Sequence, residues 1–196
     1  MGRRRLVIAT ANPGKLAEFG ELLGTALIDL EAVACDVEES GATYEENAAL
    51  KARAACCATG LPALGDDSGL EVEALGGEPG VQSKRLAPTQ PERNRELWRR
   101  LAAVPRPWRA RFVCALALAT PDGRVQTFRG QVDGEVLPEP RGQGGFGYDP
   151  IFLVPEAGRT FAEMDSAEKH RWSHRGRAIR RLLESGALER SATLPV

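Results

Sequence analysis

The sequence predicts one domain of the α/β class built around a central mixed sheet. Short apolar, β-branched segments alternate along the chain with segments whose apolar residues recur at helical spacing. The chain has 196 residues, and at about 150 residues per domain this length favours a single domain over residues 1–196. Charged residues make up 27% and hydrophobic residues 42% of the chain, a balance that excludes a disordered tail or a coiled coil.

The first half of the chain predicts a strand and two helices, followed by a second strand. Residues 6–10 form a short apolar run, and the helix after it carries Leu16, Phe19, Leu22 and Leu23 at helical spacing. Thr43 and Glu46 have the spacing of a capping box, so an Ala-rich helix begins there and ends near Gly60. The second strand is expected at 70–75.

The second half predicts a third helix, a β-hairpin and a last helix. Thr89 and Glu92 again have capping-box spacing. Residues 111–119 are typical of a buried strand, and 125–130 return as its hairpin partner after a Pro-Asp-Gly turn. The last helix stops at Gly186 and carries Ile179, Leu182 and Leu183.

Composition excludes several classes of function. The formal net charge of −1 argues against a strongly basic nucleic-acid-binding protein, and no apolar run approaches the roughly 20 residues of a membrane span. The four cysteines, Cys35, Cys56, Cys57 and Cys114, form no C-x-x-C pair, so we expect a reduced, cytoplasmic compartment. With only two histidines in the chain, any metal is expected to be a hard cation held by oxygen.

Charge is segregated along the chain in spite of the near-neutral sum. Residues 16–50 contain nine acids and no base, 84–111 contain nine bases and two acids, and 169–181 contain six bases and no acid. Each run has an ordinary interpretation as a solvated helix face. Together they also suit a metal-assisted phosphate site, in which carboxylates hold the cation while Lys and Arg contact phosphate oxygens.

The first candidate motif lies between the first strand and the first helix. A strand-to-helix junction can aim backbone N–H groups and the helix dipole at an anion, and a lysine there adds a positive charge. The spacing is not that of a Walker A loop, and an ordinary strand-to-helix turn is the alternative. The residues of this motif are Thr10, Ala11, Asn12, Pro13, Gly14 and Lys15.

The second motif is a pair of adjacent carboxylates, Asp66 and Asp67, followed by Ser68 and flanked by glycines. Mg²⁺ accepts one or two carboxylates and takes its other ligands from water and substrate phosphates. Glu38, in the segment Glu-Glu-Ser-Gly, could add a carboxylate from another loop. The alternative is an Asx-type turn, to which Asp, Ser and Gly are well suited.

The third motif is the glycine-rich segment around Phe146, Gly147, Tyr148 and Asp149. Glycines allow close backbone approach to a ligand, either aromatic ring can stack on a base, and the carboxylate can accept hydrogen bonds from a purine edge. A plain aromatic-rich loop is the alternative.

The last motif comprises Lys169 and the pair His174 and Arg175. If Ser173 caps the C-terminal helix, the pair lies in its first turn, where an anion is favoured. If Asp165 or Ser166 is the cap, the helix begins earlier and His174 is one surface residue among others.

Taken in order, these segments resemble the Ham1-like non-canonical purine nucleoside triphosphate pyrophosphatases. The resemblance covers residues 6 to about 185 and rests on TANPGK, EESGATYEENAALKARAA, DDSGLEVEALGGEPGVQSKR, GGFGYDPIF, TFAEMDSAEKH and SHRGRA. It implies an elongated α/β fold whose two lobes flank a substrate cleft. It also implies a homodimer that needs Mg²⁺ and hydrolyses ITP, dITP and XTP to the monophosphate and pyrophosphate, which keeps deaminated purines out of DNA and RNA.

The resemblance also implies roles for individual residues. Thr10 to Lys15 match the triphosphate-binding loop, Asp67 the catalytic proton acceptor and a metal ligand, and Glu38 the second metal carboxylate. Ser68 matches a substrate contact. The base-binding segment is matched by Phe146, Gly147, Tyr148 and Asp149, and contacts to base or phosphate by Lys169, His174 and Arg175. The sequence leaves open whether Asp67 acts as a base or mainly as a metal ligand.

Selectivity for hypoxanthine and xanthine over adenine is expected to follow from their 6-oxo group. This group accepts hydrogen bonds at the position where adenine has an amino donor. Donors aimed at that position, such as Lys169 or Arg175, would be left unpaired by adenine, and each buried unpaired donor costs roughly 1–3 kcal/mol.

Two other functions are compatible with parts of the sequence. One is a related nucleotide pyrophosphatase of the Maf-like type, acting on modified pyrimidine or methylated nucleotides. The other is a nucleic-acid-binding module based on the basic stretch 84–111, which salt-sensitive DNA binding would reveal. The expected partner is a small nucleoside triphosphate, with no nucleic acid and no membrane.

Overall fold

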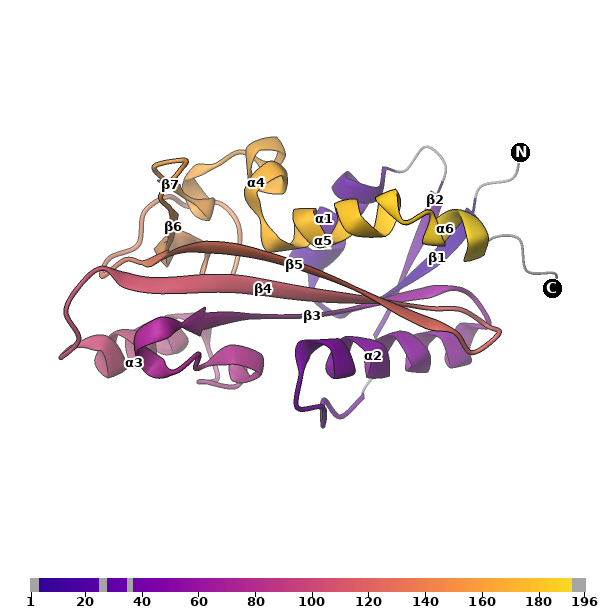
Figure 1. Cartoon of the computed structure of the whole chain (residues 1–196), viewed down its shortest axis with the longest axis horizontal. Helices are drawn as coiled ribbons and strands as arrows, with labels where there is room; N and C mark the ends of the chain where they lie inside the picture. The colour runs from indigo at the N-terminus through magenta and orange to yellow at the C-terminus, as the bar shows by residue number, and fades with distance from the viewer. Residues whose placement is uncertain (1–3, 25–27, 35–36, 192–196) are drawn as a thin grey trace. The chain divides into compact units, whose positions relative to one another are not determined.

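The computed structural model describes residues 4–24, 28–34 and 37–191. It confirms an α/β fold with a mixed sheet of seven strands in the order β2-β1-β3-β4-β5-β6-β7 (Figure 1). The strands are β1 (Arg4–Ala9), β2 (Ile28–Val33), β3 (Ala63–Val72), β4 (Trp108–Ala119), β5 (Val125–Val136), β6 (Phe152–Val154) and β7 (Arg159–Thr160). The helices are α1 (Pro13–Leu23), α2 (Tyr44–Thr59), α3 (Gln90–Leu101), α4 (Ser166–Trp172), α5 (His174–Glu184) and α6 (Ala187–Ser191).

The chain groups into two compact units, each with its own core. Unit 1 comprises 1–67, 114–130 and 175–196, and unit 2 comprises 68–113 and 131–174. The prediction of a single domain over residues 1–196 therefore stays a prediction, as do the two lobes around a cleft.

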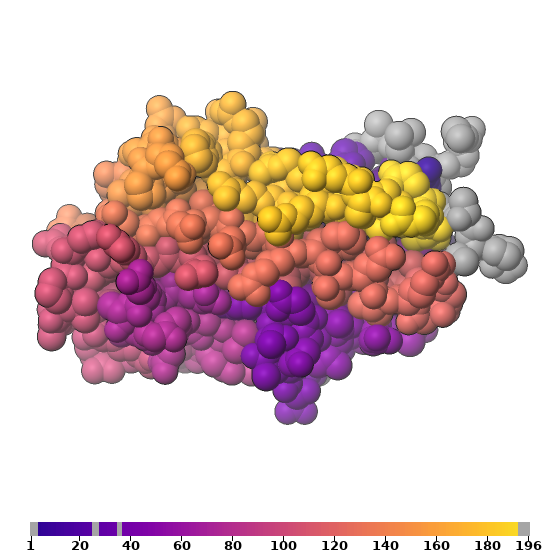
Figure 2. Space-filling view, viewed as in Figure 1, coloured from indigo at the N-terminus to yellow at the C-terminus, as the bar shows by residue number. Residues whose placement is uncertain are grey.

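Unit 1 contains the parallel part of the sheet. β1 pairs in parallel with β2 and with β3. Figure 1 shows α1 and α5 on one face of these strands and α2 on the other. The core of the unit is lined by Leu6, Ile8, Phe19, Leu64, Leu116, Ile179 and Leu182. The exposed side of α5, part of the yellow surface in Figure 2, carries Arg180, Arg181 and Glu184.

Unit 2 has an aromatic core. β5 pairs antiparallel with β6, and β6 with β7. Phe112 lies 4.5 Å from Phe152, and Phe161 lies 5.4 Å from Phe152, measured between ring centroids. These rings pack with residues of α3, among them Leu97 and Leu101.

Both capping boxes form as expected. Thr43 accepts from the backbone N–H of Glu46, and the Glu46 carboxylate accepts from the backbone of Thr43. The same reciprocal pair forms between Thr89 and Glu92 at the start of α3. α2 ends at Thr59 and is capped by Gly60, whose φ of 67° is the left-handed conformation that glycine adopts at low cost.

The strand expected at 70–75 is wrong in its bounds. β3 runs from Ala63 to Val72 and contains both aspartates, while Glu73–Leu75 form a short 3₁₀ turn. The Asx-turn alternative for Asp66 and Asp67 therefore fails. In β3 both carboxylates are buried and have charged or amide partners.

One other predicted strand boundary also differs from the structure. β5 extends to Val136, six residues beyond the expected end at Gly130. The sequence pattern also missed β2, half of whose residues are exposed, and α6, a helix of only five residues. Cys35 lies outside the described residues, and no helix in the described part of the chain is long and apolar enough to cross a membrane.

Candidate functional site

The predicted site residues fall into two groups, one in each unit. Unit 1 holds Thr10 to Lys15, Glu38, Asp67 and Arg175, and unit 2 holds Ser68, Phe146 to Asp149, Lys169 and His174. Within unit 1, Lys15 and Arg175 contact the carboxylate of Asp66, which precedes Asp67 in the chain. Within unit 2, Phe146 and Lys169 contact the carboxylate of Asp149, and the His174 ring stacks on an aromatic ring.

The loop Thr10 to Lys15 forms the capped start of α1. The side-chain oxygen of Asn12 accepts from the N–H groups of Gly14 (2.9 Å) and Lys15 (3.2 Å). The Asn12 N–H itself donates to Oγ1 of Thr10 at 3.1 Å. The predicted anion-binding N–H groups thus exist at the helix start, where Asn12 satisfies two of them from within the chain.

Asp66 is the centre of a buried cluster of charges. Its carboxylate pairs with Nζ of Lys15 and with Nε of Arg175, the latter at 3.1 Å. The thiol of Cys114 donates to Oδ2 of Asp66 at 3.1 Å. Arg175 also pairs with Glu18, so its guanidinium bridges two carboxylates. The cluster joins α1, β3, β4 and α5, four elements far apart in the sequence.

The charges of this cluster stabilise one another. Burial alone would raise the pKa of Asp66, but Arg175 and Lys15 hold it well below its ordinary value. Burial likewise opposes the charge of Arg175, and Asp66 and Glu18 more than compensate, so the pKa of Arg175 is raised. Arg175 is only 2% exposed.

Asp67 lies in a second, different environment. Its Oδ2 accepts from Nδ2 of Asn47 at 3.2 Å, and its Oδ1 lies 3.2 Å from Nζ of Lys51. Lys51 also contacts Oε1 of Glu39 at 2.9 Å, so one ammonium bridges the two carboxylates. Both Asn47 and Lys51 come from α2.

The pKa of Asp67 moves in the opposite direction from that of Asp66. Burial raises it, Lys51 lowers it, and the negative charge of Glu39 raises it again, with a net rise. Burial opposes the charge of Lys51, but Asp67 and the hydrogen bond to Glu39 raise its pKa overall. Asp67 is therefore the more basic of the two adjacent carboxylates.

Glu38 is exposed, and no hydrogen bond or ion pair joins its side chain to Asp67 among the described residues. Its backbone carbonyl accepts from the N–H of Ser40 at 2.9 Å. The neighbouring Glu39 is the carboxylate that shares a cation with Asp67. In the part of the chain that is described, no group of three or more His, Cys, Asp or Glu side chains is arranged to hold a metal.

In unit 2 the carboxylate of Asp149 holds the Phe146 segment together. Its Oδ2 accepts from the N–H of Phe146 (2.7 Å) and from Nζ of Lys169 (2.6 Å). The Lys169 ammonium lies over the Phe146 ring, 4.7 Å from its centroid. Gly145 has a φ of 69°, and a Cβ there would lie 2.2 Å from Oδ2 of Asp149.

The two candidate stacking rings differ in their surroundings. Tyr148 is buried in the core of unit 2, where its hydroxyl donates to the carbonyl of Ser83 at 2.9 Å. Burial raises the pKa of Tyr148 to about 12. Phe146 is partly exposed. Of the two rings, Phe146 is thus the one open to a base.

Each alternative for the C-terminal cap is right about one helix, but the expectation that an Asp165 cap leaves His174 on the surface is wrong, because His174 is buried. Asp165 caps α4, where it accepts from the N–H of Glu168, and Ser173 separates α4 from α5. α5 then begins at His174, so His174 and Arg175 do lie in its first turn. The His174 ring stacks on Phe112, with centroids 4.7 Å apart and an interplanar angle of 10°.

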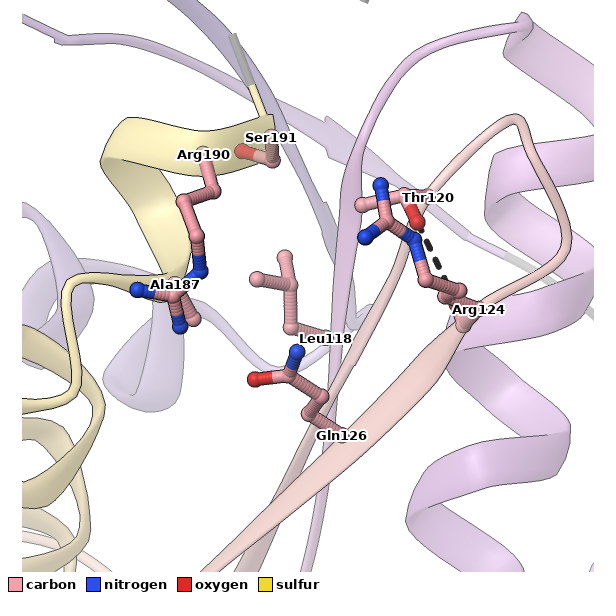
Figure 3. Close-up of a pocket in the computed structure, with 7 residues that line it drawn as sticks. All are labelled: Leu118, Thr120, Arg124, Gln126, Ala187, Arg190 and Ser191. Carbon is pink, nitrogen blue, oxygen red and sulfur yellow. Dashed lines mark hydrogen bonds between the residues drawn. The ribbon is translucent and has the colours of Figure 1, made fainter. Parts of the chain in front are cut away.

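Two surface pockets lie away from these residues. Figure 3 shows one in unit 1, between the β4–β5 hairpin and α6, lined by Leu118, Thr120, Arg124, Gln126, Ala187, Arg190 and Ser191. A larger one in unit 2, of about 510 Å³, is lined by Glu71, Arg109, Arg111 and Asp133, among others. Neither contains a predicted site residue.

Comparison with known proteins identifies the family. Residues 6–185 match the Ham1 family. This chain belongs to the Ham1 family. A dITP/XTP pyrophosphatase of Thermus thermophilus is 54% identical over 190 residues, which cover 92% of this chain and 91% of the relative. A dITP/XTP pyrophosphatase of Symbiobacterium thermophilum is 52% identical, with 94% and 95% of the two chains covered.

Solved structures of Ham1 proteins have the same fold. The Coxiella burnetii HAM1 protein aligns with a TM-score of 0.83 at 43% identity, covering 93% of this chain and 98% of that one. The Staphylococcus aureus Ham1 protein also aligns with a TM-score of 0.83, at 38% identity, covering 95% and 100% of the two chains. These matches confirm the predicted Ham1-like fold class.

Sequence reasoning on this Ham1 chain missed two contributors to the Asp67 environment, Asn47 and Lys51. Both lie in an Ala-rich helix and resemble ordinary polar helix positions. The available signal was their i, i+4 spacing, which places them on the same helix face as the buried Ala48, Ala52 and Ala55. Two polar side chains next to a buried alanine face indicate that the element packed against that face offers them a polar partner.

Proposed function

We propose that this chain is a hydrolase that cleaves ITP, dITP and XTP to the nucleoside monophosphate and pyrophosphate. The names of its relatives, which are more than 50% identical to it, support this activity. The observation that carries the proposal is the environment of Asp67, a carboxylate of raised pKa held by an amide and an ammonium. Such an enzyme keeps deaminated purines out of DNA and RNA.

The triphosphate is assigned to the start of α1. Thr10, Ala11, Asn12, Pro13, Gly14 and Lys15 form the strand-to-helix junction, where the positive end of the helix dipole favours an anion. Lys15 adds a positive charge that Asp66 holds in place. Ser68, which follows Asp67 directly and is partly exposed, is assigned a substrate contact.

The carboxylates of unit 1 fit a hard divalent cation, and we assign it as Mg²⁺. Glu39 and Asp67 already share one cation, the Lys51 ammonium, and the charge of Glu39 helps to raise the pKa of Asp67. Oxygen donors of this kind, together with substrate phosphates, form the usual Mg²⁺ site. Glu38 and Asp67 would hold the ion, which when bound supplies charge neutralisation for the phosphate oxygens.

The chemical step assigned to Asp67 is the transfer of one proton. Water attacks the α-phosphorus, its proton passes to the Asp67 carboxylate, and pyrophosphate leaves. A raised pKa suits a carboxylate for this task, because a base works best when its pKa approaches the working pH. Asn47 and Lys51 hold the two carboxylate oxygens, while Lys15 meets the negative charge of the phosphates.

The base is assigned to the Phe146 segment. Phe146 offers a partly exposed ring for stacking, and the Lys169 ammonium above it can donate to the 6-oxo group of hypoxanthine or xanthine. Gly147 and Tyr148 shape the segment, and Asp149 orients Lys169. His174 and Arg175 are assigned contacts to base or phosphate. For Arg175 such a contact requires the guanidinium to exchange one of its carboxylate partners.

We also propose a cytoplasmic homodimer with no nucleic-acid partner and with residues 1–196 as a single domain. The thiol of Cys114 donates a hydrogen bond to Asp66, an arrangement that supports a reducing compartment. A light-scattering mass near twice that of the 21.1 kDa chain is expected, and a mass near one chain would contradict the dimer.

The activity is tested by measuring pyrophosphate release from ITP, XTP, dITP, ATP, GTP and dTTP, with Mg²⁺ and with EDTA. We expect release from the first three only, and only with the metal. Equal rates on ATP and ITP, or release of orthophosphate, would overturn the assignment. Preference for a modified pyrimidine or methylated nucleotide would favour the Maf-like alternative.

A further inference from the structure

α2 packs directly on β3 at a glycine. A Cβ built on Gly65 would lie 2.1 Å from the carbonyl oxygen of Ala48 and 2.7 Å from the N of Ala52. Both are backbone atoms that cannot move aside without shifting the helix. Only glycine therefore permits this separation of helix and strand, which brings the polar side chains of α2 within reach of β3.

Two of these side chains hold the two oxygens of one carboxylate. Asn47 donates to Oδ2 of Asp67 and Lys51 contacts Oδ1, both at 3.2 Å. Asn47 and Lys51 are four residues apart, so they lie one above the other on the same helix face. The orientation of the Asp67 carboxylate is thus fixed from both sides by one helix.

Asn47 makes a second contact with its other side-chain atom. Its Oδ1 accepts from the N–H of Gly41 at 2.8 Å. A Cβ on Gly41 would lie 2.7 Å from that oxygen and 2.7 Å from Cβ of Glu46. Gly41, which lies three residues after Glu38 and two after Glu39, is therefore held closely against the start of α2.

We infer that Asn47 is a positioning residue that fixes Asp67 and the segment carrying Glu38 in one arrangement. An amide suits this role because it donates on one side and accepts on the other. A carboxylate of the same shape can only accept. Asn47 is 3% exposed, so solvent does not substitute for either contact. The inference rests on the proposed role of Asp67.

Two substitutions separate the two contacts. Asn47→Ala removes both, whereas Asn47→Asp keeps an acceptor for the Gly41 N–H and loses the donor to Asp67. Partners that orient a metal-binding carboxylate typically contribute about 10–100-fold to metal affinity or activity. We expect kcat on ITP to fall by about that factor in both variants, with KM for ITP little changed.

A second readout does not need turnover. Mn²⁺ binding to the nucleotide-free protein, followed by electron paramagnetic resonance, is expected to weaken by about 10-fold in Asn47→Ala. If Asn47 had only a structural role, Asn47→Ala would lower the midpoint of unfolding. It would leave the Mn²⁺ affinity unchanged, and it would not lower kcat selectively over KM. Asn47→Asp preserves side-chain volume and serves if the alanine variant does not fold.

Asn94→Ala is the matched control. Asn94 lies on α3 and accepts from Nε2 of Gln90 at 2.8 Å, and its removal is expected to leave kcat and Mn²⁺ affinity at wild-type values. If Asn47→Asp kept the wild-type kcat, the hydrogen bond from Asn47 to Asp67 would not be the contact that matters for turnover. Wild-type Mn²⁺ affinity in Asn47→Ala would overturn the inference altogether. If the wild-type protein hydrolyses none of the nucleotides, the proposed function fails, and Mn²⁺ binding still decides the role of Asn47.

Discussion

Asp66 and Asp67 are consecutive residues of β3 whose carboxylates lie on opposite faces of the strand. Asp66 meets Lys15 of α1 and Arg175 of α5, and Asp67 meets Asn47 of α2. Figure 1 shows α1 and α5 on the face of the unit 1 strands opposite to α2. This follows from the two-residue period of a strand. The surroundings on the two faces shift the carboxyl pKa in opposite directions: the pKa of Asp66 is lowered and that of Asp67 is raised. The same residue type thus forms a buried ion-pair cluster on one face and, in the proposed function, acts as the base on the other.

Asp66→Asn is expected to destabilise the protein by about 3–5 kcal/mol, because it leaves Arg175 buried without its main partner. Urea denaturation followed by circular dichroism measures this. Glu96→Gln is the control, since Glu96 pairs with Arg99 on the exposed surface of α3, and its midpoint should match that of the wild type. Equal midpoints for Asp66→Asn and Glu96→Gln would contradict the role given to the buried cluster.

Asp67→Asn is expected to lose activity and keep or gain stability. A folded-state pKa above the unfolded value means that the ionised carboxylate opposes folding at neutral pH, so its removal relieves that cost. Turnover on ITP should fall by about 10²–10⁴-fold, the usual contribution of a positioned base. Thermal unfolding at pH 7 without metal should occur at or above the wild-type midpoint. A clearly lower midpoint, or nearly full turnover, would refute this prediction.

Stability should depend on pH through Asp66. Its folded pKa lies below the unfolded value of about 3.9, so the unfolded state binds more protons as the pH falls through that range. The stabilisation is therefore present above about pH 4 and decreases at lower pH. Urea midpoints at pH 5, 4 and 3 in EDTA should fall more steeply for the wild type than for Asp66→Asn. Parallel slopes would show that other carboxyls dominate acid unfolding.

Local signals in the sequence predicted the local structure well. The capping boxes at Thr43 and Thr89 place helix starts correctly because their hydrogen bonds span only three residues. For the segment at Asp66 the sequence leaves a metal-binding carboxylate pair and an Asx-type turn as alternatives, because Asp, Ser and Gly favour turns when nothing opposes them. Here Lys15 and Arg175 neutralise Asp66, and the strand continues through it.

Long-range partners were beyond the reach of sequence patterns. Arg175 is separated from Asp66 by 109 residues, and no periodicity links the two. The family resemblance implies that Arg175 contacts base or phosphate, and its place in the first turn of a helix favours an anion. In the fold, that anion is a pair of protein carboxylates, Asp66 and Glu18.

Lys169→Met is expected to reduce discrimination between ITP and ATP. The methionine keeps the apolar stem near Phe146 but removes the donor proposed for the 6-oxo group. The ratio of kcat/KM for ITP to that for ATP should fall by about 10-fold or more, which corresponds to one lost buried hydrogen bond. Lys84→Met, at an exposed position of unit 2, is the control. An unchanged ratio in Lys169→Met would remove Lys169 from base selection.

The chain passes between its two units four times, after residues 67, 113, 130 and 174. No single cut can therefore release either unit intact. A peptide of residues 1–67 would contain Asp66 and Lys15 but neither Cys114 nor Arg175. Its central carboxylate would be deprived of its guanidinium, so such a fragment is not expected to fold by itself. For the same reason, a gene fusion that exchanges one contiguous block could not graft either unit onto another protein, and the two units must be inherited together.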